Sequence, residues 1–360
     1  MHNKAWKEQI AQRLTNASAF AHFLGIDNIT DAGILEAEKH FPMAVTPYYA
    51  SLITKPYEND PIFLQCIPSK LELINPHWLT NDPLGELGCS HGQRLIHRYP
   101  DRALLLVSSE CATYCRHCTR KRISSTTLPH ISDQELEDAC KYLKQHPEID
   151  DVLISGGDPL LLDDDIIEHI LTQIKEIKSV KAIRIATRTL VTLPMRFTHS
   201  LIEILSKAKP VFVNTQFNHP KEITPQALTA AAMLIDAGIP VANQFVLLKG
   251  VNDTKECVEM LCRTLYHNRI RPYYMFQCDL VKGVEHFRTP ISTGIEIMDH
   301  LRGRLSGMAI PNFAVDIPGL SGKIELLPNY ILEERENETI LRDNRGRITS
   351  YPSPLKYIKQ

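Results

Sequence analysis

The sequence has no excess of either charge. Its 360 residues carry 40 Lys and Arg against 42 Asp and Glu, a formal net charge of −2. A nucleic-acid-binding surface needs an excess of basic residues, so this balance argues against that class of protein. The sequence also lacks an apolar run of 18 or more residues, which argues against a membrane span. The N-terminal stretch MHNKAWKEQIAQRL has no apolar core of a secretory signal, so we expect a cytoplasmic protein.

The sequence also lacks the even number of cysteines that is typical of a disulfide-bonded protein. The chain has nine cysteines, and an odd number in a reducing compartment indicates metal binding, catalysis or burial rather than a disulfide framework. Most of them are scattered, and the simplest interpretation is that these are small buried hydrophobic residues. Cys111, Cys115 and Cys118 differ, because they form a C-x3-C-x2-C motif within CATYCRHC.

This motif is suited to an iron–sulfur cluster. Three thiolates hold a [4Fe–4S] cluster and leave its fourth iron without a protein ligand, and catalysis at a metal centre requires such an open position. The cationic stretch RHCTRKR favours thiolates and an anionic cluster. A zinc site with His117 as the fourth ligand is the alternative. His117 could also shield the cluster or simply pack.

Apolar, β-branched runs recur after residue 100 and predict six strands, over 102–108, 151–158, 182–188, 211–217, 241–248 and 271–277. Helical spacing between them predicts helices over 132–146, 164–177 and 224–238, with Ser132 and Thr224 as N-caps. Alternation of strands and helices predicts an α/β fold with parallel strands and right-handed crossovers. Six strands are too few for a closed eight-stranded barrel, so a partial barrel is expected, with an open doubly wound sheet as the alternative.

The composition divides the chain into three segments. Residues 1–95 contain several prolines and predict a separate, mainly helical region. Residues 96–310 hold the alternating core, and residues 311–360 form a C-terminal segment in which the alternation ends. In either α/β geometry the active site lies at the carboxyl ends of the strands. The cysteine motif and the sequences GGD (156–158) and QCD (277–279) fall at such ends.

The cysteine motif after the first strand of a β/α repeat resembles the radical S-adenosylmethionine (SAM) superfamily. HRYPDR, ISGGDPLL, FNHPKEIT, LLKGVND, RPYYMFQCDL and VDIPGLSGKIELLPNY narrow the resemblance to the lysine 2,3-aminomutase family, over roughly residues 40–352. The resemblance implies a partial (β/α)6 barrel of the radical SAM type, with a helical N-terminal region and a short C-terminal extension. It also implies an isomerase in which a 5′-deoxyadenosyl radical and a pyridoxal 5′-phosphate (PLP) aldimine move the α-amino group of lysine to C3, giving β-lysine.

The resemblance assigns the cluster and SAM to particular residues. The three cysteines of the motif ligate the [4Fe–4S] cluster, whose open iron binds SAM. Gly156, Gly157 and Asp158 match the family's GGD sequence beside the methionyl amino group of SAM. Glycines allow close backbone approach, and a carboxylate accepts from an ammonium group. Taken alone, GGD is also common in strand-to-helix turns. Gln244 matches another position on the SAM side.

The resemblance likewise places PLP. Lys323 in GLSGKIELLPNY matches the lysine that forms a Schiff base with this cofactor. Arg98 and Arg102 in HRYPDR match candidates for binding its phosphate, with Tyr99 beside them. The alternative for these arginines is a surface ion pair with Asp101.

Three further residues match substrate-binding positions of the family. Arg120 matches the arginine that binds the substrate carboxylate, a task that suits its bidentate fork. Asp279 and Asp316 match the two carboxylates that receive the ε-ammonium of lysine. Relatives that act on glutamate should carry cationic or neutral residues there, so two aspartates favour lysine. Asp316 could instead only cap a loop.

Several expectations concern partners and alternatives. The substrate is expected to be lysine, the reductant a flavodoxin or ferredoxin, and the assembly a homo-oligomer. Longer clostridial-type members carry a cysteine-rich zinc segment, and because no cysteine follows Cys278 we expect no structural zinc. A related branch of the family serves β-lysine modification of elongation factor P, and it remains an alternative. So do an aminomutase for another amino acid, a radical SAM enzyme without PLP and a purely structural metal module.

Overall fold

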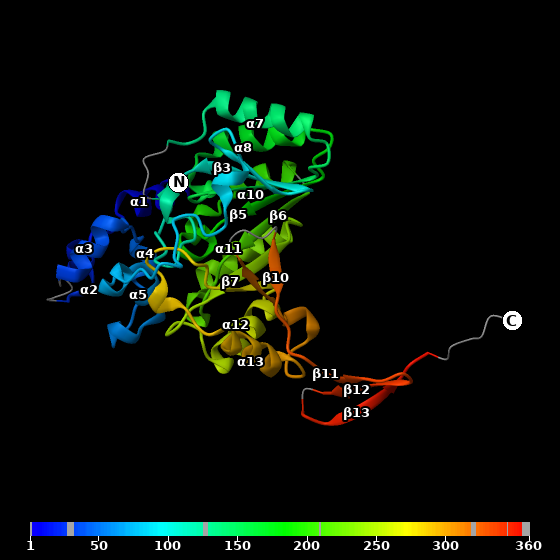
Figure 1. Ribbon diagram of the computed structural model, residues 1–360. Helices are drawn as coiled ribbons and strands as arrows, with labels where there is room; N and C mark the ends of the chain where they lie inside the picture. The colour runs from blue at the N-terminus through cyan, green and yellow to red at the C-terminus, as the bar shows by residue number, and fades with distance from the viewer. Residues whose placement is uncertain are drawn as a thin grey trace.

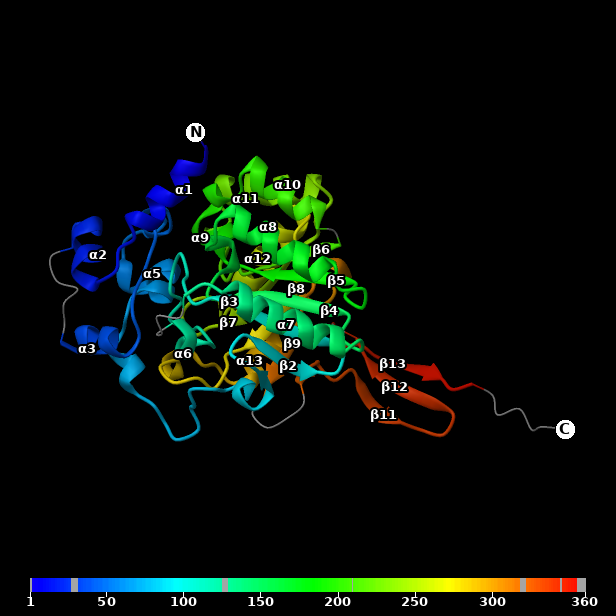
Figure 2. The same cartoon turned by 90° about the horizontal axis from the view of Figure 1, so that it is seen from above.

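A computed structural model describes residues 2–26, 32–124, 129–208, 210–317, 322–343 and 345–354 of the chain. Its main feature is a ten-stranded sheet with helices along its outer side (Figures 1 and 2). All six predicted strands are present and pair in parallel, in chain order. They are β3 (Arg102–Ser108), β4 (Asp151–Gly156), β5 (Ala182–Ala186), β6 (Val211–Thr215), β7 (Val241–Leu247) and β8 (Arg271–Gln277).

Further strands, none of them predicted, extend this core at both edges. β9 (Asn312–Asp316) pairs in parallel with β8, although the pattern of alternation ends near residue 310. β10 (Lys323–Glu325) then runs antiparallel to β9, while β1 (Ser90–His91) and β2 (Leu95–Tyr99) form an antiparallel edge beside β3. The sheet therefore extends beyond residues 96–310, and the division into three segments stays a prediction.

The strand order confirms the partial barrel. The ten strands follow one another in sequence order, from β1 at one edge to β10 at the other. A doubly wound sheet needs a point where the strand order reverses, and this sheet has none in the part of the chain that is described. The doubly wound alternative is therefore wrong.

Helices cross over between the parallel strands and cover the outer face of the sheet. They are α7 (Asp133–Gln145), α8 (Asp164–Lys175), α10 (His199–Lys207), α11 (Pro225–Asp236), α12 (Lys255–His267) and α13 (Ile291–Leu301), with the short α6 (Lys121–Ser124) and α9 (Thr189–Thr192). The predicted caps are confirmed. Ser132 forms a capping box with Glu135 at the start of α7, and the Thr224 side chain accepts from the amide of Ala227 in α11.

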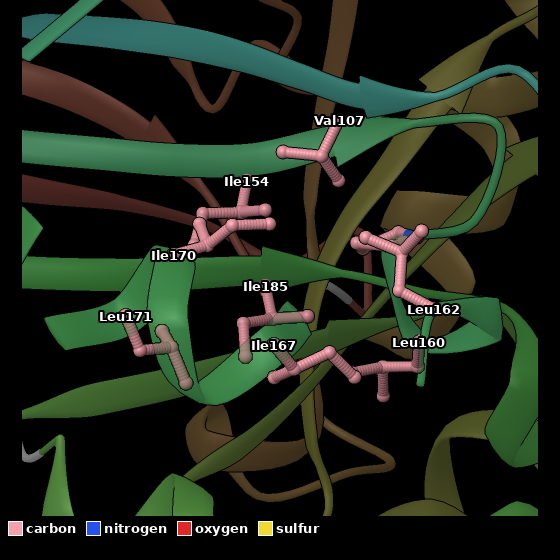
Figure 3. A pocket seen from close by; sticks show the side chains of 9 residues that line it. Val107, Ile154, Leu160, Leu162, Ile167, Ile170, Leu171 and Ile185 are labelled. Carbon is pink, nitrogen blue, oxygen red and sulfur yellow. The ribbon is translucent and has the colours of Figure 1, made fainter. Parts of the chain in front are cut away.

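The core lies between the sheet and these helices. Figure 3 shows apolar side chains of β3, β4 and β5 facing α8 and the turn before it. They are Val107, Ile154, Ile185, Leu160, Leu162, Ile167, Ile170 and Leu171. The space among them is about 10 Å³, at the lower limit for one water molecule, so it is a packing gap.

The N-terminal region is helical, as predicted. It contains α1 (His2–Ala11), α2 (Ala17–Leu24), α3 (Ala32–His40), α4 (Pro47–Ala50) and α5 (Pro61–Cys66). Trp6 of α1 is buried against Ala112 and Leu193, so this helix packs directly on the cysteine loop. No helix in the described ranges is long and apolar enough to cross a membrane.

A second sheet projects from the main body near the C-terminus (Figures 1 and 2). It consists of β11 (Ile331–Glu334), β12 (Glu338–Arg342) and β13 (Ile348–Pro352), all antiparallel. The hydroxyl of Tyr330 donates to Asp299 of α13 at 3.0 Å, which fastens the first strand to the body.

Candidate active site

One cavity of about 510 Å³ runs along the inner face of the main sheet, and all of the predicted site residues line it. It begins at the cysteine loop, at the carboxyl ends of the parallel strands, and reaches Arg102 at the start of β3. The predicted cluster, SAM, PLP and substrate positions are therefore parts of a single site. This volume is typical of a cavity that holds small molecules.

The cysteine loop follows β3 and is held by the N-terminal region. The amide of Tyr114 donates to the carbonyl of Ala44 at 2.9 Å, and the amide of Arg116 donates to that of Gln65 at 2.8 Å. Arg13 adds a hydrogen bond of 2.8 Å from Nη1 to the carbonyl of Cys111. Contacts from three N-terminal segments thus set the loop conformation.

The three thiols fit a cluster site. All are free, but burial raises the pKa of Cys111 well above its usual range, so in the unliganded protein the cationic stretch does not favour this thiolate as the sequence led us to expect. Asp158, Cys118 and Cys115 raise that pKa further, and the three cysteines line the same cavity. A cluster fits because each thiolate binds a different iron atom.

A zinc ion on the cysteines and His117 is not supported. His117 is buried and packs edge-on against Phe287, and its Nε2 lies 3.1 Å from Nε2 of Gln216 and 3.2 Å from Nδ2 of Asn218. His117 therefore packs within the protein, one of the expected alternatives, and its shielding of a cluster stays a prediction.

Gly156 and Gly157 let the end of β4 pass close to the cysteine loop. Gly156 has a φ of +132°, and a Cβ there would lie 2.2 Å from the carbonyl oxygen of Ser108. A Cβ on Gly157 would lie 2.3 Å from the carbonyl oxygen of Glu110. Only glycine allows this approach. The amide of Gly157 donates to Ser108 at 2.6 Å, so the GGD turn is fastened to the loop that carries the cysteines.

Asp158 has an extensive set of partners within the protein. Its Oδ1 accepts from the hydroxyl of Thr187 at 2.7 Å and from the amide of Leu160 at 3.1 Å. Its Oδ2 accepts from the amides of Arg188 at 2.7 Å and Thr189 at 3.1 Å. Asp158 therefore holds the carboxyl end of β5 beside the GGD turn, which agrees with the alternative that GGD forms a strand-to-helix turn. Its contact with SAM, like that of Gln244 on β7, stays a prediction.

Lys323 lies among aromatic rings in the part of the cavity away from the cysteine loop. Its Nζ is 5.3 Å from the ring centre of Tyr99, 6.0 Å from that of Tyr274 and 5.6 Å from that of Phe276. Nζ also donates to the hydroxyl of Tyr99 at 3.4 Å and lies 3.9 Å from Oδ2 of Asp316. A partly exposed primary amine flanked by aromatic rings fits a PLP site.

The two arginines proposed for the PLP phosphate flank the ring of Tyr99. The guanidinium of Arg102 is 4.8 Å from the ring centre, and that of Arg98 is 5.7 Å from it. Arg102 pairs with Asp101 at 2.8 Å, the alternative raised by the sequence. Arg98 pairs with Asp316 at 3.0 Å. This pair joins a predicted phosphate ligand to a predicted ammonium ligand, which the sequence did not indicate.

The predicted substrate residues lie between the cysteines and Lys323. The hydroxyl of Thr119 donates to Asp279, and burial raises the pKa of this aspartate to about 6. Asp316 raises this pKa further, whereas Arg120 and Lys323 lower it, so each of these three charged groups acts on Asp279. Two acids, an arginine and an amine thus share one cavity.

Sequence reasoning missed three contributors to this site. Arg188, at the carboxyl end of β5, donates from Nη1 to Sγ of Cys115 at 2.7 Å and pairs with Glu222 at 2.7 Å. Thr119 holds Asp279, and Glu86 holds Arg120. Arg188 lies at the end of a predicted strand and Thr119 lies next to the cysteine motif, so their positions in the sequence could have indicated a place in the site. Nothing in the sequence around Glu86 indicated its partner.

The partial barrel, with three cysteines in the loop after its first parallel strand, defines a radical SAM enzyme. The family model described as "Radical SAM superfamily" matches residues 105–261, and that described as "Lysine-2,3-aminomutase" matches residues 298–360.

Relatives along nearly the whole chain identify the family. The chain is 43% identical over 352 residues to L-lysine 2,3-aminomutase of Clostridium subterminale, covering 98% of this chain and 85% of that protein. It is 45% identical over 355 residues to L-lysine 2,3-aminomutase of Methanococcus maripaludis, covering 98% of this chain and 82% of that protein. It is 40% identical over 343 residues to glutamate 2,3-aminomutase of Clostridioides difficile, covering 95% of this chain and 81% of that protein. The chain therefore belongs to the lysine 2,3-aminomutase family, isomerases that use a [4Fe–4S] cluster, SAM and PLP.

Proposed function

We propose that this protein is an L-lysine 2,3-aminomutase that converts L-lysine to β-lysine. The observation that carries the proposal is the presence of Asp279 and Asp316 in the same cavity as Lys323. Buried carboxylates favour a substrate with a distal ammonium group and disfavour one with a distal carboxylate. The acidic pair therefore supports lysine over glutamate, the substrate named for one of the relatives.

The proposed roles follow from positions in the cavity. Lys323 holds PLP, and Arg98, Tyr99 and Arg102 surround its phosphate. Asp279 and Asp316 bind the ε-ammonium, and Arg120 binds the α-carboxylate of lysine. An anion at Arg98 and a cation at Asp316 replace the ion pair that these two residues form with each other.

The cysteine end of the cavity completes the assignment. Cys111, Cys115 and Cys118 ligate the cluster, and Gly156, Gly157, Asp158 and Gln244 line the SAM side. The cofactors supply the radical chemistry. The protein fixes both ends of the substrate through Arg120 and Asp279, and the rings of Tyr274 and Phe276 flank Lys323.

Product analysis tests this proposal. The purified protein is reconstituted anaerobically with iron and sulfide and incubated with SAM, PLP, dithionite and L-lysine. We expect β-lysine to form, and parallel incubations with glutamate and arginine should give no β-amino acid. Formation of β-glutamate alone would show that the aspartates do not select the substrate.

We further propose a cytoplasmic homo-oligomer that receives electrons from a flavodoxin or ferredoxin. Modification of elongation factor P is a variant of the same function, in which a partner ligase attaches the β-lysine to that factor. Lysates that contain elongation factor P, added to the reaction above, separate this variant from release of free β-lysine.

A further inference from the structure

Glu86 lies in the cavity wall against the guanidinium group of Arg120. It begins the short helix η3 (Glu86–Cys89), and its side chain is only 5% exposed. Its carboxylate accepts from Nε of Arg120 at 2.9 and 3.1 Å, and from Nη2 at 2.6 Å. Nε and Nη2 both donate to Oε1, and Nε also reaches Oε2, so this is a charge-assisted ion pair along the Nε–Nη2 edge of the guanidinium group.

The contact leaves the other edge of Arg120 for a second anion. A guanidinium group has five N–H donors, and Glu86 uses the one on Nε and one on Nη2. Nη1 of Arg120 contacts no acceptor in the described part of the chain, while Arg120 lines the cavity. The end-on edge formed by Nη1 and Nη2 also has the spacing of a carboxylate.

Glu86 is itself fixed in place. Its amide donates to Oδ1 of Asp82 at 3.0 Å, and its Oε2 accepts from Nη2 of Arg122 at 2.7 Å. An arginine side chain loses rotational freedom when it binds a ligand, which weakens binding. Because Glu86 is anchored at both its backbone and its carboxylate, it holds Arg120 in one orientation before a ligand arrives.

We propose that Glu86 is a positioning residue that orients Arg120 toward the α-carboxylate of the substrate. The inference rests on the proposed function, because the role of Arg120 is part of that proposal. Glu86 acts through Arg120 and does not touch the substrate. Its effect therefore falls on the affinity for ligands that carry an α-carboxylate. If Glu86 instead competed with the substrate for Arg120, removing its charge would raise the affinity for these ligands.

Steady-state kinetics of Glu86→Gln test the proposal. This variant keeps the shape of the side chain and loses its charge, so the KM for lysine should rise on the order of tenfold, as for a lost charge-assisted contact. The kcat should change by less than about threefold, because an effect on substrate binding leaves the later step unchanged. Glu135→Gln is the matched control, since Glu135 pairs with Arg94 at 2.9 Å outside the cavity, and it should leave the KM unchanged.

A ligand without a carboxylate separates positioning from a general structural effect. Cadaverine is lysine without its carboxylate, and its inhibition constant should be the same for Glu86→Gln and the wild type. The affinity for lysine, read from the visible absorption of bound PLP, should fall in the variant. Equal weakening of both ligands would mean that Glu86 only maintains the fold, and a lower KM for lysine would mean that it competes with substrate.

The two proposals fail in different ways. A wild-type protein that makes no β-lysine refutes the proposed function, whatever the variants do. A wild-type protein that makes β-lysine, beside a Glu86→Gln variant of unchanged KM, refutes only the positioning role. Iron content and circular dichroism of each variant, measured first, verify folding. If Glu86→Gln is misfolded, Glu86→Asp takes its place, because it keeps the charge but is one methylene too short to hold Arg120.

Discussion

At the scale of the residue, the site depends on charges held in a buried cavity. Asp279 is the clearest case, because burial raises its pKa to about 6 and Asp316 adds to this effect. The hydroxyl of Thr119 and the cations Arg120 and Lys323 act in the opposite direction. The balance leaves Asp279 close to its titration range near neutral pH, where its charge can govern substrate binding.

Asp279 should make lysine binding depend on pH. The carboxylate is ionised above a pH of about 6 and protonated below it. We therefore expect kcat/KM for lysine to fall as the pH decreases through about 6, since the neutral acid no longer attracts the ε-ammonium. Asp279→Asn should raise the KM by about 100-fold, as for an ammonium left without its charged partner.

Two measurements check this prediction. A pH profile of kcat/KM should show the decrease for the wild type and lose it in Asp279→Asn. SAM cleavage without substrate should be nearly the same in both proteins. Equal loss of SAM cleavage and of lysine binding would contradict a role at the ε-ammonium.

Lys323→Ala should abolish aminomutase activity and spare the cluster. Removal of a residue that forms a covalent bond in catalysis lowers turnover by at least about a thousandfold. Borohydride treatment should fix PLP to the wild-type chain and not to the variant, while iron content stays equal. Lys178→Ala, at an exposed position outside the cavity, is the control. Full turnover by Lys323→Ala would mean that another amine binds PLP.

At the scale of the element, helices and strands place these residues by close packing. α13 lies against β9, the strand that ends at Asp316, and Gly294 forms the contact. A Cβ on Gly294 would lie 2.2 Å from Cζ of Phe313, a ring that is fully buried. The position of Asp316 thus depends on a glycine in a helix.

Gly294→Ala should therefore destabilise the protein. Overpacking against a buried ring lowers the free energy of unfolding by about 1–3 kcal/mol, even though alanine favours a helix. Chemical denaturation should show a lower midpoint with an unchanged slope. Gly307→Ala is the matched control, because a Cβ there has no atom within 4 Å. An unchanged midpoint for Gly294→Ala would mean that Phe313 can move.

Elements were easier to predict than their contacts. The six parallel strands and the capped helices follow from local periodicity, which depends on neighbouring residues only. β9 was missed, although NFAVD is apolar, because the pattern of alternation ends there. Lys323 and Asp279 were placed by resemblance, whereas Glu86 and Arg188 gained their roles only through partners distant in the sequence.

At the scale of the whole molecule, the N-terminal region and the barrel form one packed unit around the cysteine loop. Trp6 in the first helix contacts Ala112 beside Cys111. The guanidinium of Arg196 lies 4.7 Å from the ring centre of Trp6. Arg13 binds the carbonyl of Cys111 from the same segment. The start of the chain therefore supports a loop about one hundred residues away.

Trp6→Ala should weaken both the fold and the cluster site. Loss of a buried tryptophan lowers the free energy of unfolding by about 3–5 kcal/mol. Because Trp6 packs next to the cysteine loop, a chelator should also remove iron faster from the variant. Tyr351→Ala, in a strand that is exposed, should alter neither property. A chelation rate equal to that of the wild type would mean that α1 does not support the loop.

The sequence by itself determined the cysteine motif, the α/β alternation and, by resemblance, the family and its cofactors. These features depend on residues that are near neighbours in the chain, so spacing and periodicity reveal them. Only the tertiary structure decided the polar contacts between residues that are distant in the sequence. Glu86 and Arg120 are 34 residues apart, Cys115 and Arg188 are 73 apart, and Arg98 and Asp316 are 218 apart. Such pairs form because the curved sheet brings the ends of distant strands and loops to one cavity, where a buried charge needs a partner.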